Sequence, residues 1–221
     1  MSRRASNALI ASAAVLAILG AWSGGAWQWA HYVGKPLTTG LLLWLVLAQQ
    51  TPVSPRYRLV VAAGMTLSLI GDVCLMLPWD LFLPGLVAFL LAHLCYIAVF
   101  APRSVPKARG AALALLLVVA ALNLIGLLPR IEPALRVPVL AYVAVLTLMV
   151  AAALARAWTP TLASAHPHST RLAAIGAIFF MLSDSLLAWD KFADGIPAAA
   201  LLVLGTYFFA QWCIARSVEA R

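Results

Sequence analysis

The chain is 221 residues long, 64% hydrophobic and only 10% charged, with a mean hydropathy of +0.99. A soluble domain of this length has no use for so much apolar surface, so the excess must face lipid. The net charge of +8 does not indicate nucleic-acid binding, because the basic residues are scattered through short loops and form no patch. The sequence therefore predicts a protein embedded in the lipid bilayer, with no nucleic-acid partner.

Apolar runs separated by Pro, Gly, Arg and Lys predict an all-α bundle of eight transmembrane helices, because a spanning helix needs about 20 mostly apolar residues. The second run is the weakest, since Lys35 and Pro36 lie at its start. We expect one integral membrane domain over residues 1–221. The runs cover residues 8–24, 33–49, 59–77, 81–100, 111–128, 137–155, 172–189 and 196–215.

The first run follows a basic start, as in a secretory signal peptide. Its apolar stretch continues toward Trp22 without a convincing small-x-small cleavage site. We therefore expect this run to be kept as an uncleaved first helix.

The distribution of Lys and Arg predicts that both termini face the cytoplasm. With the N-terminus inside, eleven of the fifteen basic residues fall in cytoplasmic segments, in agreement with the positive-inside rule. The eleven are Arg3, Arg4, Arg56, Arg58, Arg103, Lys107, Arg109, Arg156, Arg171, Arg216 and Arg221. The other four are Lys35, Arg130, Arg136 and Lys191, on the outer side.

Two carboxylates lie inside predicted spans. Asp72 and Asp184 each come five residues before the outer end of a helix, or roughly 7–8 Å below it at 1.5 Å per residue. Lys35 begins a span at the same surface. A charge at mid-helix costs about 2.5–3.5 kcal/mol on insertion scales, so such residues are usually functional. The alternative is an ion pair with Lys35 that only locks helices together.

Other polar residues of the spans lie on stripes that can face the bundle interior. His93 is either a hydrogen-bonded core residue or a functional one, and Tyr207 and Gln211 are either structural or part of a site. Asn123 is expected to hydrogen-bond between helices. The stripes are Phe82, Gly85, Phe89, His93 and Tyr96; Gly64, Ser68, Gly71 and Asp72; Lys35, Thr38 and Thr39; and Tyr207 with Gln211.

Several kinds of site are excluded or disfavoured. The chain has no GxSxG, no HExxH and no phosphate-binding Gly-rich loop. His93 is the one histidine inside the predicted spans, whereas zinc hydrolases use three protein ligands that are usually His-rich. Cys74, Cys95 and Cys213 are dispersed in apolar runs and read as packing residues. We expect no metal and no cofactor.

Five blocks of sequence, in this order, resemble the YhhN family of lysoplasmalogenase-like membrane proteins. They cover most of the chain from the second helix onward. The blocks are KPLTTGLLL (35–43), SLIGDVCLM (68–76), FLPGLVAFLLAHLCYI (82–97), GAIFFMLSDSLLA (176–188) and TYFFAQWCI (206–214).

The resemblance implies a membrane hydrolase that cleaves the vinyl ether bond of a lysophospholipid, giving a fatty aldehyde and a glycerophospho-alcohol. Under it, the polar positions of the family map to Asp72, Asp184 and His93 as catalytic residues and to Lys35, Tyr96, Tyr207 and Gln211 as substrate-binding residues. The chain is rich in Ala and Arg and has short loops, which is typical of bacterial proteins. We therefore expect it in the bacterial inner (plasma) membrane.

The chemistry fits two carboxylates in different protonation states. Vinyl ethers are labile to acid, and hydrolysis needs proton delivery, a stabilised oxocarbenium-like cation and water, as in glycosidases. Burial favours the neutral form of one carboxyl group, while the other stays ionised. Intramembrane Asp and His also build proton relays, so the alternatives are a small proton-coupled transporter and a non-catalytic lipid-binding protein.

Overall fold

The chain folds as a bundle of long helices, and the computed structural model describes residues 3–101 and 104–220. Arg103 and Arg221, counted above as cytoplasmic, lie outside the described residues. The prediction of an all-α fold is confirmed, since the described ranges contain no strand. The helices are α1 (Arg3–Ser23), η1 (Gly25–Trp27), α2 (Gln28–Leu47), α3 (Pro55–Met76), α4 (Phe82–Phe100), α5 (Pro106–Leu127), η2 (Leu128–Arg130), α6 (Pro133–Ala157), α7 (Pro160–Ala165), α8 (Pro167–Phe192) and α9 (Ala199–Arg216).

Proline sets the start of many of these helices. Proline suits the first helical turn, where its missing N–H would have no intrahelical partner anyway. At the start of α3, Ser54 adds a cap, because its hydroxyl accepts a hydrogen bond of 3.1 Å from the Tyr57 amide. The breakers that separate the apolar runs in the sequence therefore also fix where the helices begin. The initiating prolines are Pro55, Pro106, Pro133, Pro160 and Pro167.

Seven of the described helices are long and apolar enough to cross a membrane: α1, α3, α4, α5, α6, α8 and α9. The predicted second span corresponds to α2, which is 20 residues long but less apolar. This helix begins at Gln28, five residues before the expected start, so Lys35 and Pro36 lie two turns inside it. An interior proline is tolerated there at the loss of one backbone hydrogen bond.

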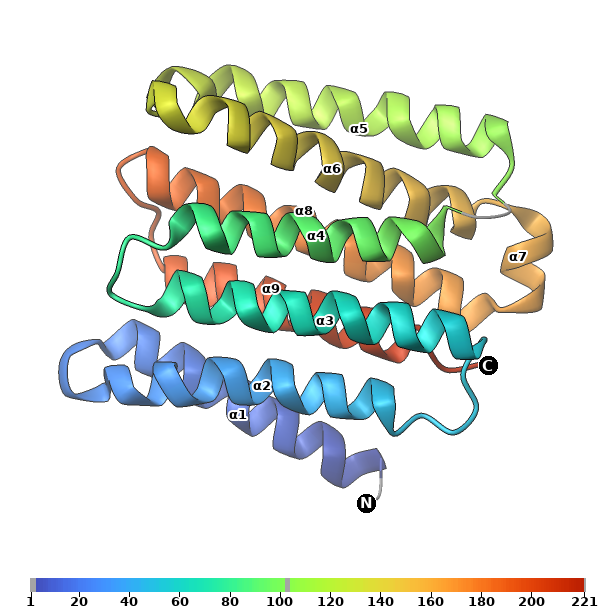
Figure 1. Ribbon diagram of the computed structural model, residues 1–221, viewed down its shortest axis with the longest axis horizontal. Helices are drawn as coiled ribbons and strands as arrows, with labels where there is room; N and C mark the ends of the chain where they lie inside the picture. Colours follow the sequence, from blue (N-terminus) through green and yellow to red (C-terminus); the bar gives the residue numbers. More distant parts are fainter. Residues whose placement is uncertain (1–2, 102–103, 221) are drawn as a thin grey trace.

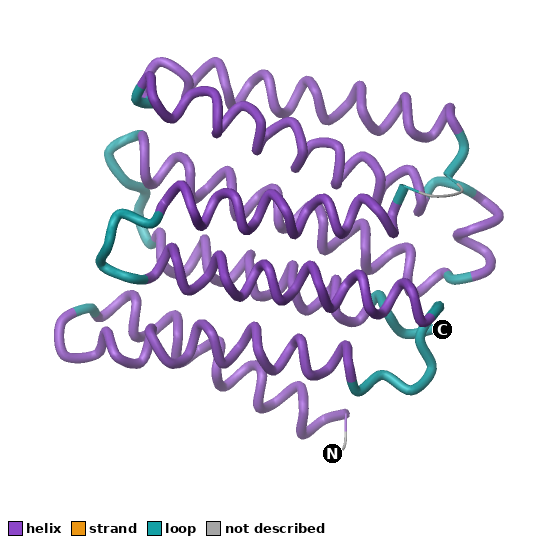
Figure 2. Tube along the Cα trace, viewed as in Figure 1, coloured by secondary structure: helices purple, strands orange, loops and turns teal. Residues whose placement is uncertain are grey.

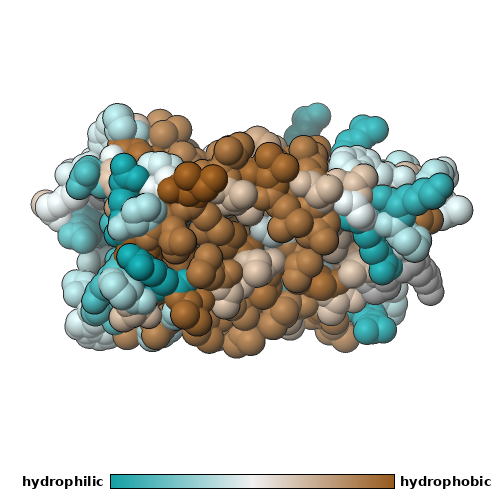
Figure 3. All heavy atoms as spheres, turned by 90° about the horizontal axis from the view of Figure 1, so that it is seen from above, coloured by the Kyte–Doolittle hydropathy of each residue, from teal (hydrophilic) through white to brown (hydrophobic). Residues whose placement is uncertain are grey.

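The long helices run side by side, with their connections gathered at the two ends of the bundle (Figures 1 and 2). Both termini lie at the same end (Figure 1). Seen from the α5 side, apolar side chains cover the middle and hydrophilic ones gather at both ends (Figure 3). Trp22, Trp27 and Trp79 are exposed and lie in or beside the turns at the end opposite the termini. This pattern matches a bilayer with an aromatic belt.

Close packing of α3 against α4 positions part of the candidate site. A Cβ atom on Gly64 would lie 2.5 Å from the Tyr96 ring, and one on Gly71 would lie 2.6 Å from the Phe89 ring. The small face of α3 predicted from the sequence, which ends at Asp72, is buried as expected. Glycine at these two positions lets the aromatic residues of α4 approach the α3 backbone.

Candidate active site

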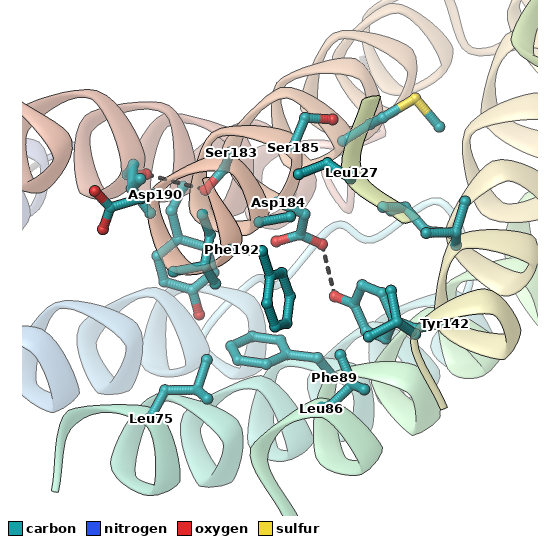
Figure 4. Close-up of a pocket in the computed structure, with 18 of the residues that line it drawn as sticks. Leu75, Leu86, Phe89, Leu127, Tyr142, Ser183, Asp184, Ser185, Asp190 and Phe192 are labelled. Carbon is teal, nitrogen blue, oxygen red and sulfur yellow. Dashed lines mark hydrogen bonds between the residues drawn. The ribbon is translucent and has the colours of Figure 1, made fainter. Parts of the chain in front are cut away.

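A cavity of about 500 Å³ lies toward the end of the bundle that carries Trp22, Trp27 and Trp79. Its volume lies within the roughly 300–1,000 Å³ typical of small-molecule sites. Its walls come from every long helix of the described chain, and most of the lining is apolar. Polar side chains reach it at a few places, among them Lys35, Asp72, Tyr142, Asp184 and Tyr207. Figure 4 shows the part around Asp184.

Asp72 is held on both carboxylate oxygens. The ammonium of Lys35, on α2, lies 3.4 Å from Oδ1. The hydroxyls of Thr39 (2.6 Å) and Tyr207 (2.7 Å) both donate hydrogen bonds to Oδ2. Asp72 is only 1% exposed and Lys35 only 8%. The two O–H donors and the cation favour the ionised form of this carboxyl group, whereas its burial favours the neutral form.

Tyr96 and Gln211 form a layer behind this carboxylate. Gln211 Nε2 donates to the Tyr207 hydroxyl (3.1 Å), and Gln211 Oε1 accepts from the Tyr96 hydroxyl (3.3 Å). Both residues are fully buried and neither lines the cavity. The structure therefore places these two predicted substrate-binding residues where they orient Tyr207 from behind the cavity wall.

Asp184 has a different environment. The Tyr142 hydroxyl donates a hydrogen bond of 2.6 Å to Asp184 Oδ2, and His93 Nε2 lies 2.9 Å from that hydroxyl and 3.7 Å from the same carboxylate oxygen. The other oxygen of Asp184 points away from Tyr142, toward Phe192 (Figure 4). The side chain is 16% exposed. No cation comparable to Lys35 neutralises this carboxyl group among its described contacts.

The His93 ring is fixed by the same hydroxyl. Because Tyr142 donates its one proton to Asp184, His93 Nε2 donates to Tyr142, which requires the Nε2–H tautomer. His93 is completely buried and its Nδ1 has no hydrogen-bond partner among the described residues. In this tautomer Nδ1 carries a lone pair that no described donor faces.

Aromatic rings join the two carboxylate clusters. The Phe89 ring packs edge to face on Tyr207 (5.9 Å between centroids) and on Phe180 (6.0 Å). Phe180 in turn packs on His93 at 4.7 Å. Phe89 also lines the cavity (Figure 4). The rings form an apolar floor with the Asp72 cluster on one side and the Asp184 cluster on the other.

The sequence did not indicate Tyr142. It lies on α6, a helix without a family signature, and it is the hydroxyl that bonds both Asp184 and His93. The available signal was one tyrosine in an otherwise aliphatic, Ala-rich segment. Lys35 pairs with Asp72, and no ion pair joins it to Asp184 among the described residues. Asn123 makes the expected interhelical bond, accepting from Trp189 Nε1 at 3.2 Å.

Metal ligands do not gather at the cavity. Within residues 3–101 and 104–220, no group of three or more His, Cys, Asp and Glu side chains is arranged to hold a metal ion. The cysteines predicted to be packing residues are partly or fully buried and unpaired.

The fold and cavity define a helical integral membrane protein with a polar site inside an apolar bundle. The chain belongs to the YhhN family, whose model matches residues 30–218.

Three relatives illustrate the range of the family. The human lysoplasmalogenase TMEM86B is 35% identical over 165 residues, covering 74% of this chain and 65% of the human protein. A lysoplasmalogenase of Mycobacterium tuberculosis is 35% identical over 167 residues, covering 72% of this chain and 60% of that protein. The membrane protein YhhN of Escherichia coli is 29% identical over 204 residues, covering 92% and 93% of the two chains. No solved structure is significantly similar.

Proposed function

We propose that this protein is a membrane hydrolase that cleaves the vinyl ether bond of lysoplasmalogens, releasing a fatty aldehyde and a glycerophospho-alcohol. The family supports this, because relatives from mammals and mycobacteria carry the name lysoplasmalogenase. The match spans 65% of the human relative, so the activity is a proposal for this chain. The observation that carries it is that Asp72 and Asp184 line one cavity in different environments.

The reaction begins with proton transfer to the vinyl carbon remote from the ether oxygen. The adjacent carbon becomes an oxocarbenium centre, which water attacks. The hemiacetal that forms then breaks its bond to the glycerol oxygen, and the hydroxyl proton moves to that oxygen. One water is consumed and one aldehyde and one alcohol are formed.

Asp184 is suited to deliver the proton. Its Oδ2 is engaged by Tyr142, while its other oxygen points into the space beside Phe192 (Figure 4). Lys35 pairs with Asp72, so the cation that favours an ionised carboxylate acts on Asp72 rather than on Asp184. After the transfer, Asp184 recovers a proton from the attacking water. Tyr142 and His93 hold the carboxyl group in orientation throughout.

Asp72 is suited to stay ionised and stabilise the cation. Lys35 Nζ lies at 3.4 Å, and Thr39 and Tyr207 donate to the same carboxylate. Its fixed negative charge, together with the face of Phe89, favours a positive centre in an apolar surrounding. Lys35, Tyr207 and, behind them, Tyr96 and Gln211 act by holding this carboxylate.

The test of function is aldehyde release by detergent-purified protein. A lysoplasmenyl lipid should yield fatty aldehyde, whereas its ester analogue should not, because only the vinyl ether gives an oxocarbenium ion on protonation. Absence of aldehyde would contradict the proposal. Solute uptake by reconstituted vesicles without aldehyde release would favour the transporter alternative, for which the comparisons give no support.

The topology that accompanies this function has eight spans, with α2 as the second, both termini in the cytoplasm, and the cavity facing the outside of a bacterial inner membrane. Eight crossings agree with termini at one end of the bundle (Figure 1). A membrane-impermeant thiol reagent should label Asp194→Cys in intact cells, in a chain whose three cysteines are replaced by Ser. Ala165→Cys should react only after permeabilisation. The opposite pattern would reverse the orientation.

A further inference from the structure

Part of the cavity lining, contributed by α5 and its neighbours α6 and α8, is mostly apolar, and we call this part the apolar branch. Val119, Ala120 and Leu124 of α5 form one wall, and Leu146 of α6 and Met181 of α8 form others. The polar residues of this branch are already satisfied. Thr147 donates to the Val143 carbonyl of its own helix at 2.7 Å, and Asn123 bonds Trp189 and the Val119 carbonyl. A surface with few free polar groups binds hydrocarbon.

The α5 wall is lightly attached to the bundle. Only 17% of its apolar stretch is buried, against 28% to 56% in the other six apolar helices. Its contacts with α8 gather at its outer end, where Trp189 donates to Asn123 and a Cβ on Gly126 would lie 2.8 Å from the Trp189 ring. Arg130 also lies over that ring, 5.7 Å from its centroid. The segment of α5 that precedes these contacts with Trp189 separates the cavity from the surrounding lipid.

We propose that this branch binds the hydrocarbon chain of a single-chain ether lipid, and that Ala120 determines how long a chain is accepted. The proposal rests on the proposed function for the reaction but concerns binding alone. One cavity of about 500 Å³ suits one chain. Ala120 has the smallest side chain on the α5 wall, so an enlarged residue there fills the branch while leaving Asp72 and Asp184 untouched.

The chain offers a matched control at the next position. Ala121 is exposed on the other side of α5, where it lines a shallow groove with Ile125 and Leu128 outside the main cavity. Ala121→Phe adds the same bulk to the same helix without entering the branch. Ala120→Leu provides a smaller change if Ala120→Phe fails to fold.

The experiment measures binding of non-cleavable 1-O-octadecyl and 1-O-decyl glycerophosphocholine to the purified full chain. Ala120→Phe should weaken octadecyl binding about tenfold or more and decyl binding less than about twofold, as expected when a hydrophobic pocket loses room for a few methylenes. Ala121→Phe should change neither. Equal weakening of both lipids, no weakening, or the same effect from Ala121→Phe would overturn the inference. Wild-type protein that binds the ether lipids but releases no aldehyde would contradict the proposed reaction and leave this inference standing.

Discussion

Tyr142 on α6 donates a hydrogen bond of 2.6 Å to Asp184 on α8, and the same hydroxyl lies 2.9 Å from His93 on α4. One phenol thus links three helices and fixes the orientation of the carboxyl group proposed as the proton donor. Because the hydroxyl faces two polar side chains in a buried place, its removal affects both.

Tyr142→Phe should lower the rate of aldehyde release at least about tenfold, since a mispositioned acid loses much of what acid catalysis contributes. It should also lower the free energy of unfolding by about 1–3 kcal/mol, because His93 loses its partner in the core. Tyr32→Phe, at the exposed hydrogen bond with Gln28, is the control. Wild-type rate and stability in Tyr142→Phe would show that the link has no role.

The Lys35–Asp72 pair gives a test by double substitution. Lys35→Met leaves the Asp72 carboxylate buried without its cation and should destabilise the protein by up to about 3–5 kcal/mol. Adding Asp72→Asn removes the uncompensated charge and should recover most of that loss. Thermal unfolding in detergent measures both, with Lys107→Met on the exposed start of α5 as control. A double variant no more stable than Lys35→Met would contradict the pairing.

The approach of α4 to α3 depends on Gly64. In Gly64→Ala the new methyl group would lie 2.5 Å from the Tyr96 ring, so the ring must shift and its bond to Gln211 is strained. The free energy of unfolding should fall by about 1–3 kcal/mol. Gly40→Ala, on α2, meets no atom within 4 Å and should cost nothing. Equal stability of the two variants would contradict the packing described here.

Much of the site was predictable because burial of charge in an apolar run stands out in a sequence. Asp72, Asp184 and Lys35 were identified this way, and helical spacing placed His93 and Tyr96 on one buried face of α4. Two features were not predictable. Tyr142 carries no charge and its helix has no polar stripe, so only three-dimensional packing places its hydroxyl between His93 and Asp184.

The second feature that could not be predicted from the sequence is the pairing of residues across helices. Spacing along one helix shows which residues share a face, but it does not show which helices face each other. Lys35 was equally close to both aspartates by depth in the membrane, and the structure pairs it with Asp72. Tyr96 and Gln211 share stripes with site residues, yet they lie behind the cavity wall rather than in it.

The central claim is that two carboxylates act together, and it is tested most directly by aldehyde release from a lysoplasmenyl lipid by purified Asp72→Asn and Asp184→Asn. Both substitutions keep the size of the side chain, so size-exclusion elution and thermal unfolding establish that each variant is folded. We predict that each loses aldehyde release by at least about a hundredfold, the usual contribution of a positioned acid or base. Full activity in either folded variant would contradict the two-carboxylate account.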